Sequence, residues 1–346
     1  DIVTTLRARI AAGQSGREPL FRQANGSFIG ASAKQFQGTD ASGVIPNTYG
    51  NADLKPERTS EYETGFDIGL FRERLTLTAT AYDKLTTDLV QTVPVDIATG
   101  VGAGPPTSVL YTNIGKVDNR GLELGLSGNV FRSLPVTVDF NTTFAMNRNK
   151  LISTGSATPI VIASGVTGLP IQEDVPGKPI GGFWSPTYTV KTSGGAVQPG
   201  DLVYGAGGAA QYVGQSTPRE EFTFGPTITF FKYLRVNALF DRRDGFTVYD
   251  GTDAFRCIVP FQVGQECNDA TAPVSRQAAA VALNGNVSNI TQSDYGYLLN
   301  GSFWKVREVT FALSAPDSWS RRFLGGRTAT ISISGRNLAT WSNYRG

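Results

Sequence analysis

A period of two in the hydrophobicity of long segments constrains this chain more than any other sequence feature. From Val136 to Met146, the segment VTVDFNTTFAM places mostly apolar side chains on one face of an extended strand and Thr, Asp and Asn on the other. The same alternation recurs over residues 75–81, 122–127, 222–230, 234–241, 308–313 and 328–334. With their flanks, most of these segments reach the roughly 9 to 11 residues that a tilted strand needs to cross a bilayer. The pattern predicts an all-β fold.

The connections between these segments come in two lengths that alternate along the chain. Tight turns are predicted at residues 71–74, 131–135 and 231–233, and long loops rich in Gly, Pro, Ser and Thr at 92–118, 150–218 and 246–301. Short turns on one rim and long loops on the other are typical of an outer-membrane β-barrel. A soluble β-sandwich also has alternating strands, but they are typically only about 5 to 6 residues long.

The two faces of the predicted strands imply two environments. The apolar positions predicted to face lipid are Val136, Phe140, Phe144, Leu234, Val236, Phe311, Ile331 and Ile333. Thr, Asn and Asp of the same strands are predicted to face the interior. Aromatic residues gather near strand ends, as in Phe230, Phe231 and Tyr233, where either an interfacial girdle or ordinary core packing would place them.

The composition argues against several classes of function. Histidine is absent from the 346 residues, which removes the usual general base of Ser-His-Asp sites and most zinc sites. Lys and Arg number 31 against 29 Asp and Glu, so no general basic field for nucleic acid is present. No apolar run approaches the roughly 18 residues of a membrane-spanning helix. We therefore expect no enzymatic activity, no metal, no cofactor and no nucleic-acid partner.

Two sequence clusters are candidates for chemical sites. Asp241, Asp244, Asp250 and Asp253 match no full calcium-binding loop, and two arginines lie among them, so a solvated lumen and loop surface is predicted. The glycine-rich residues 205–208 lack the Lys-Ser/Thr of a phosphate-binding loop and are predicted to be flexible.

Cys257 and Cys267 are separated by nine residues in a turn-rich stretch. This spacing closes a small-loop disulfide easily, which would place the loop outside the cytoplasm, and the alternative is two free thiols of a cytosolic protein. In the same long loop, the helix propensity of Gln277-Ala-Ala-Ala predicts a short helix over Ala278–Leu283.

Several strings resemble the C-terminal half of TonB-dependent outer-membrane receptors. They are Asn51-Ala-Asp-Leu-Lys-Pro-Glu57, Glu61-Tyr-Glu-Thr-Gly65, RLTLTATAYDKLTTDLV from Arg74, Asn113-Ile-Gly-Lys116 and Asn119-Arg-Gly-Leu-Glu123. Others look like the SusC/RagA branch: Pro199-Gly-Asp-Leu202, FWKVREV from Phe303 to Val309, and Ser334-Gly-Arg-Asn-Leu338 with the Thr340-Trp341 and Asn343-Tyr-Arg-Gly346 that follow. The strings occur in order through nearly the whole chain.

The resemblance implies a transmembrane antiparallel β-barrel of 22 strands with short periplasmic turns and long extracellular loops. Residues 1–346 would be the C-terminal part, with about nine strands, and the plug domain and closing strand would be absent. The chain begins at Asp1 without a secretory signal pattern, so a processed or truncated piece is expected.

The same resemblance implies TonB-dependent active import of a large nutrient, a glycan or peptide fragment, across the outer membrane of a Gram-negative bacterium. Outer-membrane lipid, a SusD-like surface lipoprotein and TonB, contacted through the N-terminal part, would be the partners. Trp184, Tyr188, Tyr204 and Tyr212 lie in the predicted outside loops, where they would stack on sugar rings or serve loop packing or partner contact. A passive channel, a surface adhesin, and a secreted β-protein that binds or cleaves carbohydrate are the alternatives.

Overall fold

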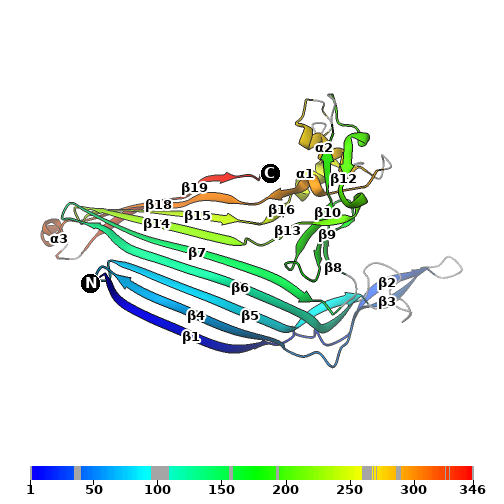
Figure 1. Ribbon diagram of the computed structural model, residues 1–346, viewed down its shortest axis with the longest axis horizontal. Helices are drawn as coiled ribbons and strands as arrows, with labels where there is room; N and C mark the ends of the chain where they lie inside the picture. The colour runs from blue at the N-terminus through cyan, green and yellow to red at the C-terminus, as the bar shows by residue number, and fades with distance from the viewer. Residues whose placement is uncertain are drawn as a thin grey trace.

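The computed structural model describes residues 2–34, 40–94, 109–155, 159–191, 195–258, 267, 269, 271–285, 290–323, 325–326 and 328–344. Within these residues, one long curved sheet dominates the molecule (Figure 1). Its main path contains nine strands, β1 (Val3–Arg17), β4 (Glu57–Leu70), β5 (Leu75–Pro94), β6 (Val109–Arg132), β7 (Val136–Ser153), β14 (Glu220–Phe230), β15 (Leu234–Asp244), β18 (Phe303–Ser314) and β19 (Thr330–Ser342). All neighbours on this path pair antiparallel, which confirms the predicted fold class.

A hairpin extends from the loop end of this sheet. It is made of β2 (Ser27–Lys34) and β3 (Asp40–Tyr49), and β3 makes a short parallel contact with the start of β6. Figure 1 shows the hairpin projecting beyond the ends of β4 to β6. No helix in the described part of the chain is long and apolar enough to cross a membrane.

The strand register decides which side chains share a face, because residues directly opposite each other in a ladder point to the same side. Val136 is opposite Phe230, and Phe230 is opposite Leu234. Val236 is opposite Phe311, which is opposite Ile333. Leu234 and Val236 are two positions apart in β15 and so share a face, which joins the two chains of pairs. The same spacing of two adds Phe140 and Phe144 in β7 and Ile331 in β19, so all the apolar positions predicted to face lipid lie on one face of the sheet.

The tight turns occur where the sequence predicts them. Residues 71–74 connect β4 to β5, and residues 231–233 connect β14 to β15. Phe231 and Lys232 have φ values of 50° and 66°, the left-handed pair that matches the twist of a two-residue hairpin turn. The connection from β18 to β19 on the same rim is longer and contains the short helix α3 (Asp317–Phe323).

The predicted loop over residues 92–118 is partly wrong. β5 continues to Pro94 and β6 begins at Val109, so much of that span is paired strand. A bulge hides the pattern: the register shifts near Leu89, and Asp88 has a φ of 57°. Asn113 stabilises the bulge, because its Nδ2 donates to the carbonyl oxygens of Asp88 at 2.8 Å and Lys55 at 2.7 Å.

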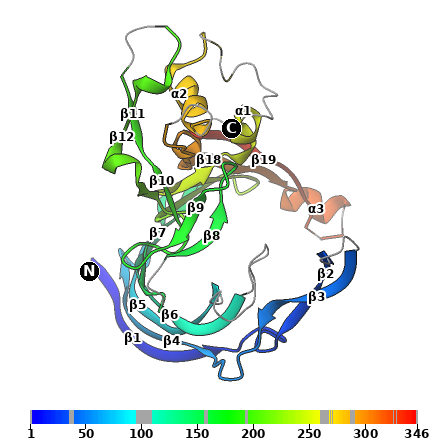
Figure 2. The same cartoon turned by 90° about the vertical axis from the view of Figure 1, so that its right-hand side faces the viewer.

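The other two long connections fold together into a compact unit, here called the loop body, at the end of the sheet opposite the tight turns (Figures 1 and 2). Its strands are β8 (Ile160–Ser164), β9 (Pro170–Asp174), β10 (Gly182–Pro186), β11 (Tyr188–Val190), β12 (Leu202–Tyr204), β13 (Ala210–Gly214), β16 (Thr247–Tyr249) and β17 (Leu298–Asn300). Its helices are η2 (Pro199–Asp201), η3 (Gly205–Gly208), α1 (Gly251–Cys257), α2 (Val274–Leu283) and η5 (Tyr295–Tyr297).

The loop body has its own apolar core. The predicted helix is present as α2, and its alanines and Leu283 are buried in two clusters with residues of α1, η5 and β12. Residues 205–208 form the short connection η3 between β12 and β13, and Ala206 and Gly207 within it have the left-handed φ values 48° and 65°. The buried side chains of α2 are mostly alanines, which pack closely but add little to a hydrophobic period, so the sequence pattern conceals this core.

Candidate functional site

The polar face of the main sheet carries charged side chains paired across neighbouring strands. The nitrogen-to-oxygen distances are 3.2 Å for Arg9–Asp67, 3.6 Å for Lys84–Glu61, 3.4 Å for Arg243–Glu221 and 3.1 Å for Arg336–Glu308. All these side chains are partly exposed, so each pair contributes at most about 1 kcal/mol to stability. Their main effect is to make this face hydrophilic from β1 to β19.

A hollow of about 580 Å³ lies against this polar face. Its lining comes from five successive strands, β1, β4, β5, β6 and β7, and consists of Arg9, Glu61, Glu63, Thr80, Tyr82, Lys84, Asn119, Glu123 and Asn147. A single hollow touches five neighbouring strands only where the sheet curves around it. The polar face is therefore the concave one, and the apolar face is convex.

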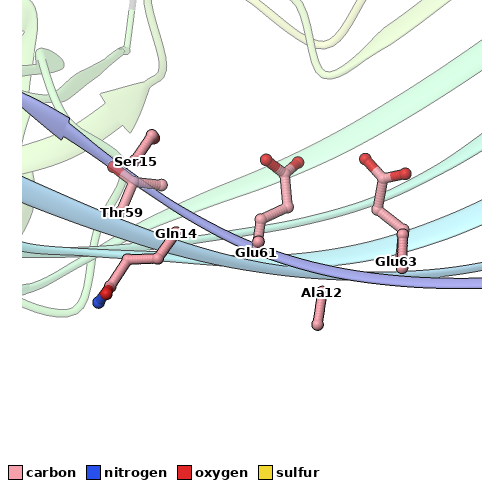
Figure 3. A pocket seen from close by; sticks show the side chains of 8 residues that line it. Ala12, Gln14, Ser15, Thr59, Glu61 and Glu63 are labelled. Atoms are coloured by element: carbon pink, nitrogen blue, oxygen red, sulfur yellow. The ribbon is translucent and has the colours of Figure 1, made fainter.

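A smaller hollow of about 290 Å³ adjoins the first, between β1 and β4. Figure 3 shows the carboxylates of Glu61 and Glu63 pointing to one side of these strands, while Ala12 and Gln14 point to the other. The two glutamates share a face because they are two positions apart in one strand. The side chains that line the two hollows are rich in carboxylates and hydroxyls, and such a surface suits a hydrated polar solute.

The four aspartates of residues 241–253 do not form one site. The predicted solvated surface is wrong for Asp241 and Asp250, which are 4% and 7% exposed. Asp241 accepts a hydrogen bond from Arg307 of β18, and Asp250 caps α1 by accepting from the Asp253 amide at 3.0 Å. The partner of Asp241 is 66 residues away and is brought close by the fold, whereas the partner of Asp250 is local. Among the described residues, no group of three or more His, Cys, Asp and Glu is arranged to hold a metal ion.

The four aromatic residues identified from the sequence lie in the loop body as two pairs. Trp184 is opposite Tyr212 in the β10–β13 ladder, with ring centroids 5.5 Å apart. Tyr188 is opposite Tyr204 in the β11–β12 ladder, with centroids 5.8 Å apart. The structure therefore brings them together two by two, in separate small sheets.

The two aromatic pairs have different surroundings. Tyr188 and Tyr204 pack against the apolar cluster that α2 forms with β12, and burial raises the pKa of Tyr204 to about 12. Beside the other pair, Lys178 Nζ lies 4.7 Å from the ring centroid of Tyr212. Trp184, Tyr212 and Lys178 thus combine aromatic surface with a cation, and no sequence motif marks Lys178 as their neighbour.

Cys257 and Cys267 are joined by a disulfide, with their Cα atoms 5.6 Å apart. Both residues are fully buried in the cluster that contains Leu283 of α2 and Tyr297 of η5. The bond ties the end of α1 to a point ten residues later in the chain. It therefore adds a covalent link inside the buried cluster that α1, α2 and η5 share.

Two buried carboxylates fix the loop body, and the sequence gives no signal for either. Asp174 of β9 accepts hydrogen bonds from Gln91 Nε2 of β5 at 3.0 Å and from the Gly181 amide at 2.8 Å, which anchors the loop body to the main sheet. Asp294 accepts from Tyr249 Oη at 2.7 Å and from Thr167 Oγ1. Burial raises the pKa of both carboxyls, and the hydrogen bonds partly oppose this rise.

Comparison with known proteins identifies relatives of this architecture. The family model described as TonB dependent receptor-like, beta-barrel, matches residues 1–256. TonB-dependent receptor P3 of Formosa agariphila is 24% identical over 335 residues, covering 88% of this chain and 32% of the relative. TonB-dependent receptor SusC of Bacteroides thetaiotaomicron is 21% identical, covering 86% of this chain and 30% of the relative. The chain thus spans about a third of the length of these relatives.

A solved structure shares the fold. The chain aligns over 100% of its length with 38% of a chain in the structure of the RagAB peptide transporter, with a TM-score of 0.74 and 19% identity. At this identity the likeness concerns the fold. The curved sheet and the loop body are therefore both features of a known β-barrel architecture.

Proposed function

Because this chain belongs to the TonB-dependent receptor-like β-barrel family, we propose that it forms part of the wall and outer mouth of an outer-membrane importer. The whole protein would take up an oligomeric nutrient across the outer membrane of a Gram-negative bacterium, with energy delivered through TonB. The apolar convex face would contact lipid, and the concave face would line the lumen.

One observation carries this proposal: the division of a nine-strand curved sheet into an apolar convex face and an ion-paired concave face. A soluble sandwich buries its apolar face under a second sheet. Here the large apolar side chains of β18 and β19 are exposed instead, with Phe311 at 51% and Ile333 at 73%. Exposed apolar surface of this extent marks a membrane or protein interaction site.

The nutrient we propose is a glycan or peptide fragment too large for passive pores. One structural neighbour, RagAB, is a peptide transporter, and SusC is among the relatives. In this chain, support comes from the polar hollows on the concave face and from Trp184, Tyr212 and Lys178 in the loop body. Aromatic rings stack on sugar or peptide groups, and a nearby cation pairs with an acidic group.

We further propose that a SusD-like surface lipoprotein covers the loop body. The loop body lies at the end of the sheet away from the tight turns (Figure 1), where extracellular loops are expected. Its disulfide is consistent with an oxidising compartment outside the cytoplasm. Tyr188 and Tyr204 would act there mainly by holding β11 and β12 on α2.

Uptake of a fluorescently labelled oligomer by intact cells tests the importer proposal. We expect deletion of the native gene to abolish uptake of one oligomeric nutrient, and loss of TonB to reproduce the defect while leaving extracellular cleavage of the nutrient unchanged. Uptake that persists without TonB would instead favour a passive channel. Normal uptake with lost cell attachment would favour an adhesin.

The ligand surface is tested in the same assay. The double variant Trp184→Ala with Tyr212→Ala is expected to reduce uptake at subsaturating oligomer by about threefold to tenfold or more. The reason is that one aromatic contact contributes about 0.5–1.5 kcal/mol to binding. Phe255→Ala, which removes a half-exposed aromatic ring from α1 of the same loop body, is the matched control. Equal effects of the two changes would contradict the assignment of Trp184 and Tyr212.

A further inference from the structure

The rim of tight turns carries one helix, α3, between β18 and β19. Figure 1 places α3 at the end of the sheet far from the loop body. Trp319 and Phe323 are 62% and 61% exposed, and their ring centroids are 5.1 Å apart. They are four positions apart and so lie on the same side of the helix.

An apolar groove of about 610 Å³ lies between α3 and the sheet. Its main lining residues are Tyr233, Leu313, Trp319, Phe323, Ala329 and Ile331. Leu313 and Ile331 are opposite each other in the β18–β19 ladder, on the same face as Phe311 and Ile333. The groove is therefore continuous with the apolar convex face.

Two arginine side chains lie next to this groove. Arg321 and Arg322 are exposed in the last turn of α3, and the guanidinium carbon of Arg322 lies 5.4 Å from the centroid of the Phe323 ring. The same pairing of an exposed aromatic residue with an exposed cation recurs on this rim, at Phe71-Arg72, Phe131-Arg132 and Phe231-Lys232. Aromatic rings at this level sit at the membrane interface, and cations beside them meet lipid phosphates.

We propose that the α3 groove binds an anionic glycerophospholipid of the adjacent, periplasmic leaflet. One acyl chain occupies the groove between Trp319 and Ile331, and the phosphate lies beside Arg321 and Arg322. A short helix whose exposed aromatic residues have arginines directly beside them, as Phe323 has Arg322, presents hydrocarbon and positive charge together and can hold such a lipid at the interface. The inference rests on the proposed placement of the convex face in the membrane.

A phospholipid fits this surface better than a peptide or a second copy of the chain. The groove lining is almost entirely hydrocarbon and offers few partners for the polar backbone of a peptide. A second copy seated on the groove would add its own Arg321 and Arg322 to an apolar contact, where unpaired charge is costly. A lipid supplies both the hydrocarbon and the anion.

Native mass spectrometry of the detergent-solubilised product of the full native gene tests the site. The protein is exchanged with dioleoylphosphatidylglycerol or dioleoylphosphatidylcholine, which share their acyl chains and differ in headgroup charge. We expect preferential retention of the phosphatidylglycerol. The double change Arg321→Gln with Arg322→Gln should reduce this retention by about fivefold per arginine. Arg17→Gln with Lys191→Gln, which removes two exposed cations near the opposite end, is the matched control.

A second variant tests the groove itself with both arginines in place. Ala329→Trp fills the groove and should reduce retention of either lipid, whereas Ala8→Trp, at an exposed alanine on the apolar face of β1, should not. Three outcomes would overturn the proposal. They are equal retention of the two lipids by the unmodified protein, unchanged lipid retention in both the double arginine variant and Ala329→Trp, and a dimer without bound lipid. Lipid retention without TonB-dependent uptake would contradict the importer function and leave this site standing.

Discussion

Arg307 of β18 donates a hydrogen bond from Nη2 to Oδ2 of Asp241 on β15. Arg307 is the extra residue of a β-bulge, because both ladders of β18 pass from Val306 to Glu308 without pairing it. Asp241 is almost fully buried beneath it. A bulge re-aims a side chain, and here the ion pair joins the re-aimed arginine to the neighbouring strand.

We predict that Asp241→Asn destabilises the protein by about 1–3 kcal/mol, because Arg307 then loses a charged acceptor at a buried position. Glu221→Gln, which breaks the exposed pair with Arg243, should cost less than about 1 kcal/mol. Guanidinium unfolding in detergent micelles, followed by tryptophan fluorescence, measures both changes. Equal losses would mean that the buried pair has no special role.

The assignment of the two faces predicts alternating accessibility along β18 and β19. Spin labels at Phe311 and Ile333 should be relaxed by oxygen, and labels at Thr310 and Ser334 by a water-soluble nickel complex. Cys257 and Cys267 do not compete for the label because they are disulfide-bonded. Labels at Val138 and Phe140 provide a second test on β7, and if both were relaxed by the nickel complex, the assignment would fail.

Reduction of the disulfide is predicted to loosen the loop body and leave the main sheet intact. A bond that closes a ten-residue separation stabilises a fold by about 2.5 kcal/mol in the chain-entropy model. After reduction, or in Cys257→Ser with Cys267→Ser, hydrogen exchange should speed up in α1 and α2. Exchange in β5 to β7 serves as the internal control, and equal acceleration there would contradict an independent loop-body core.

Acidification is predicted to stabilise the region around Asp294. Burial raises the pKa of this carboxyl above its unfolded value, so the folded form holds a proton that the unfolded form releases. The resulting stabilisation is complete below the unfolded pKa of about 4 and is lost as pH rises through the folded pKa. Limited proteolysis of the loop body should therefore be slower at pH 5 than at pH 8. Asp294→Asn should reduce this difference, and an unchanged pH dependence would assign it to other groups.

The sequence was sufficient for the features that depend on neighbours within one strand. Side chains alternate across a strand by covalent geometry, so the period of two in VTVDFNTTFAM already separates the apolar from the polar face. The tight turns follow from the same pattern, because each one interrupts it for only a few residues, as at Phe231 and Lys232.

Only the tertiary structure decided the contacts between distant segments. Nothing near Asp241 in the sequence indicates Arg307, which lies 66 residues later. Three other contacts likewise depend on how separate segments pack. They are the pairing of Trp184 with Tyr212, the packing of α2 against its neighbours in the loop body, and the hydrogen bond from Gln91 to Asp174. Such contacts arise from shape and burial in three dimensions, and small alanine and glycine residues leave no periodic trace of them in the chain.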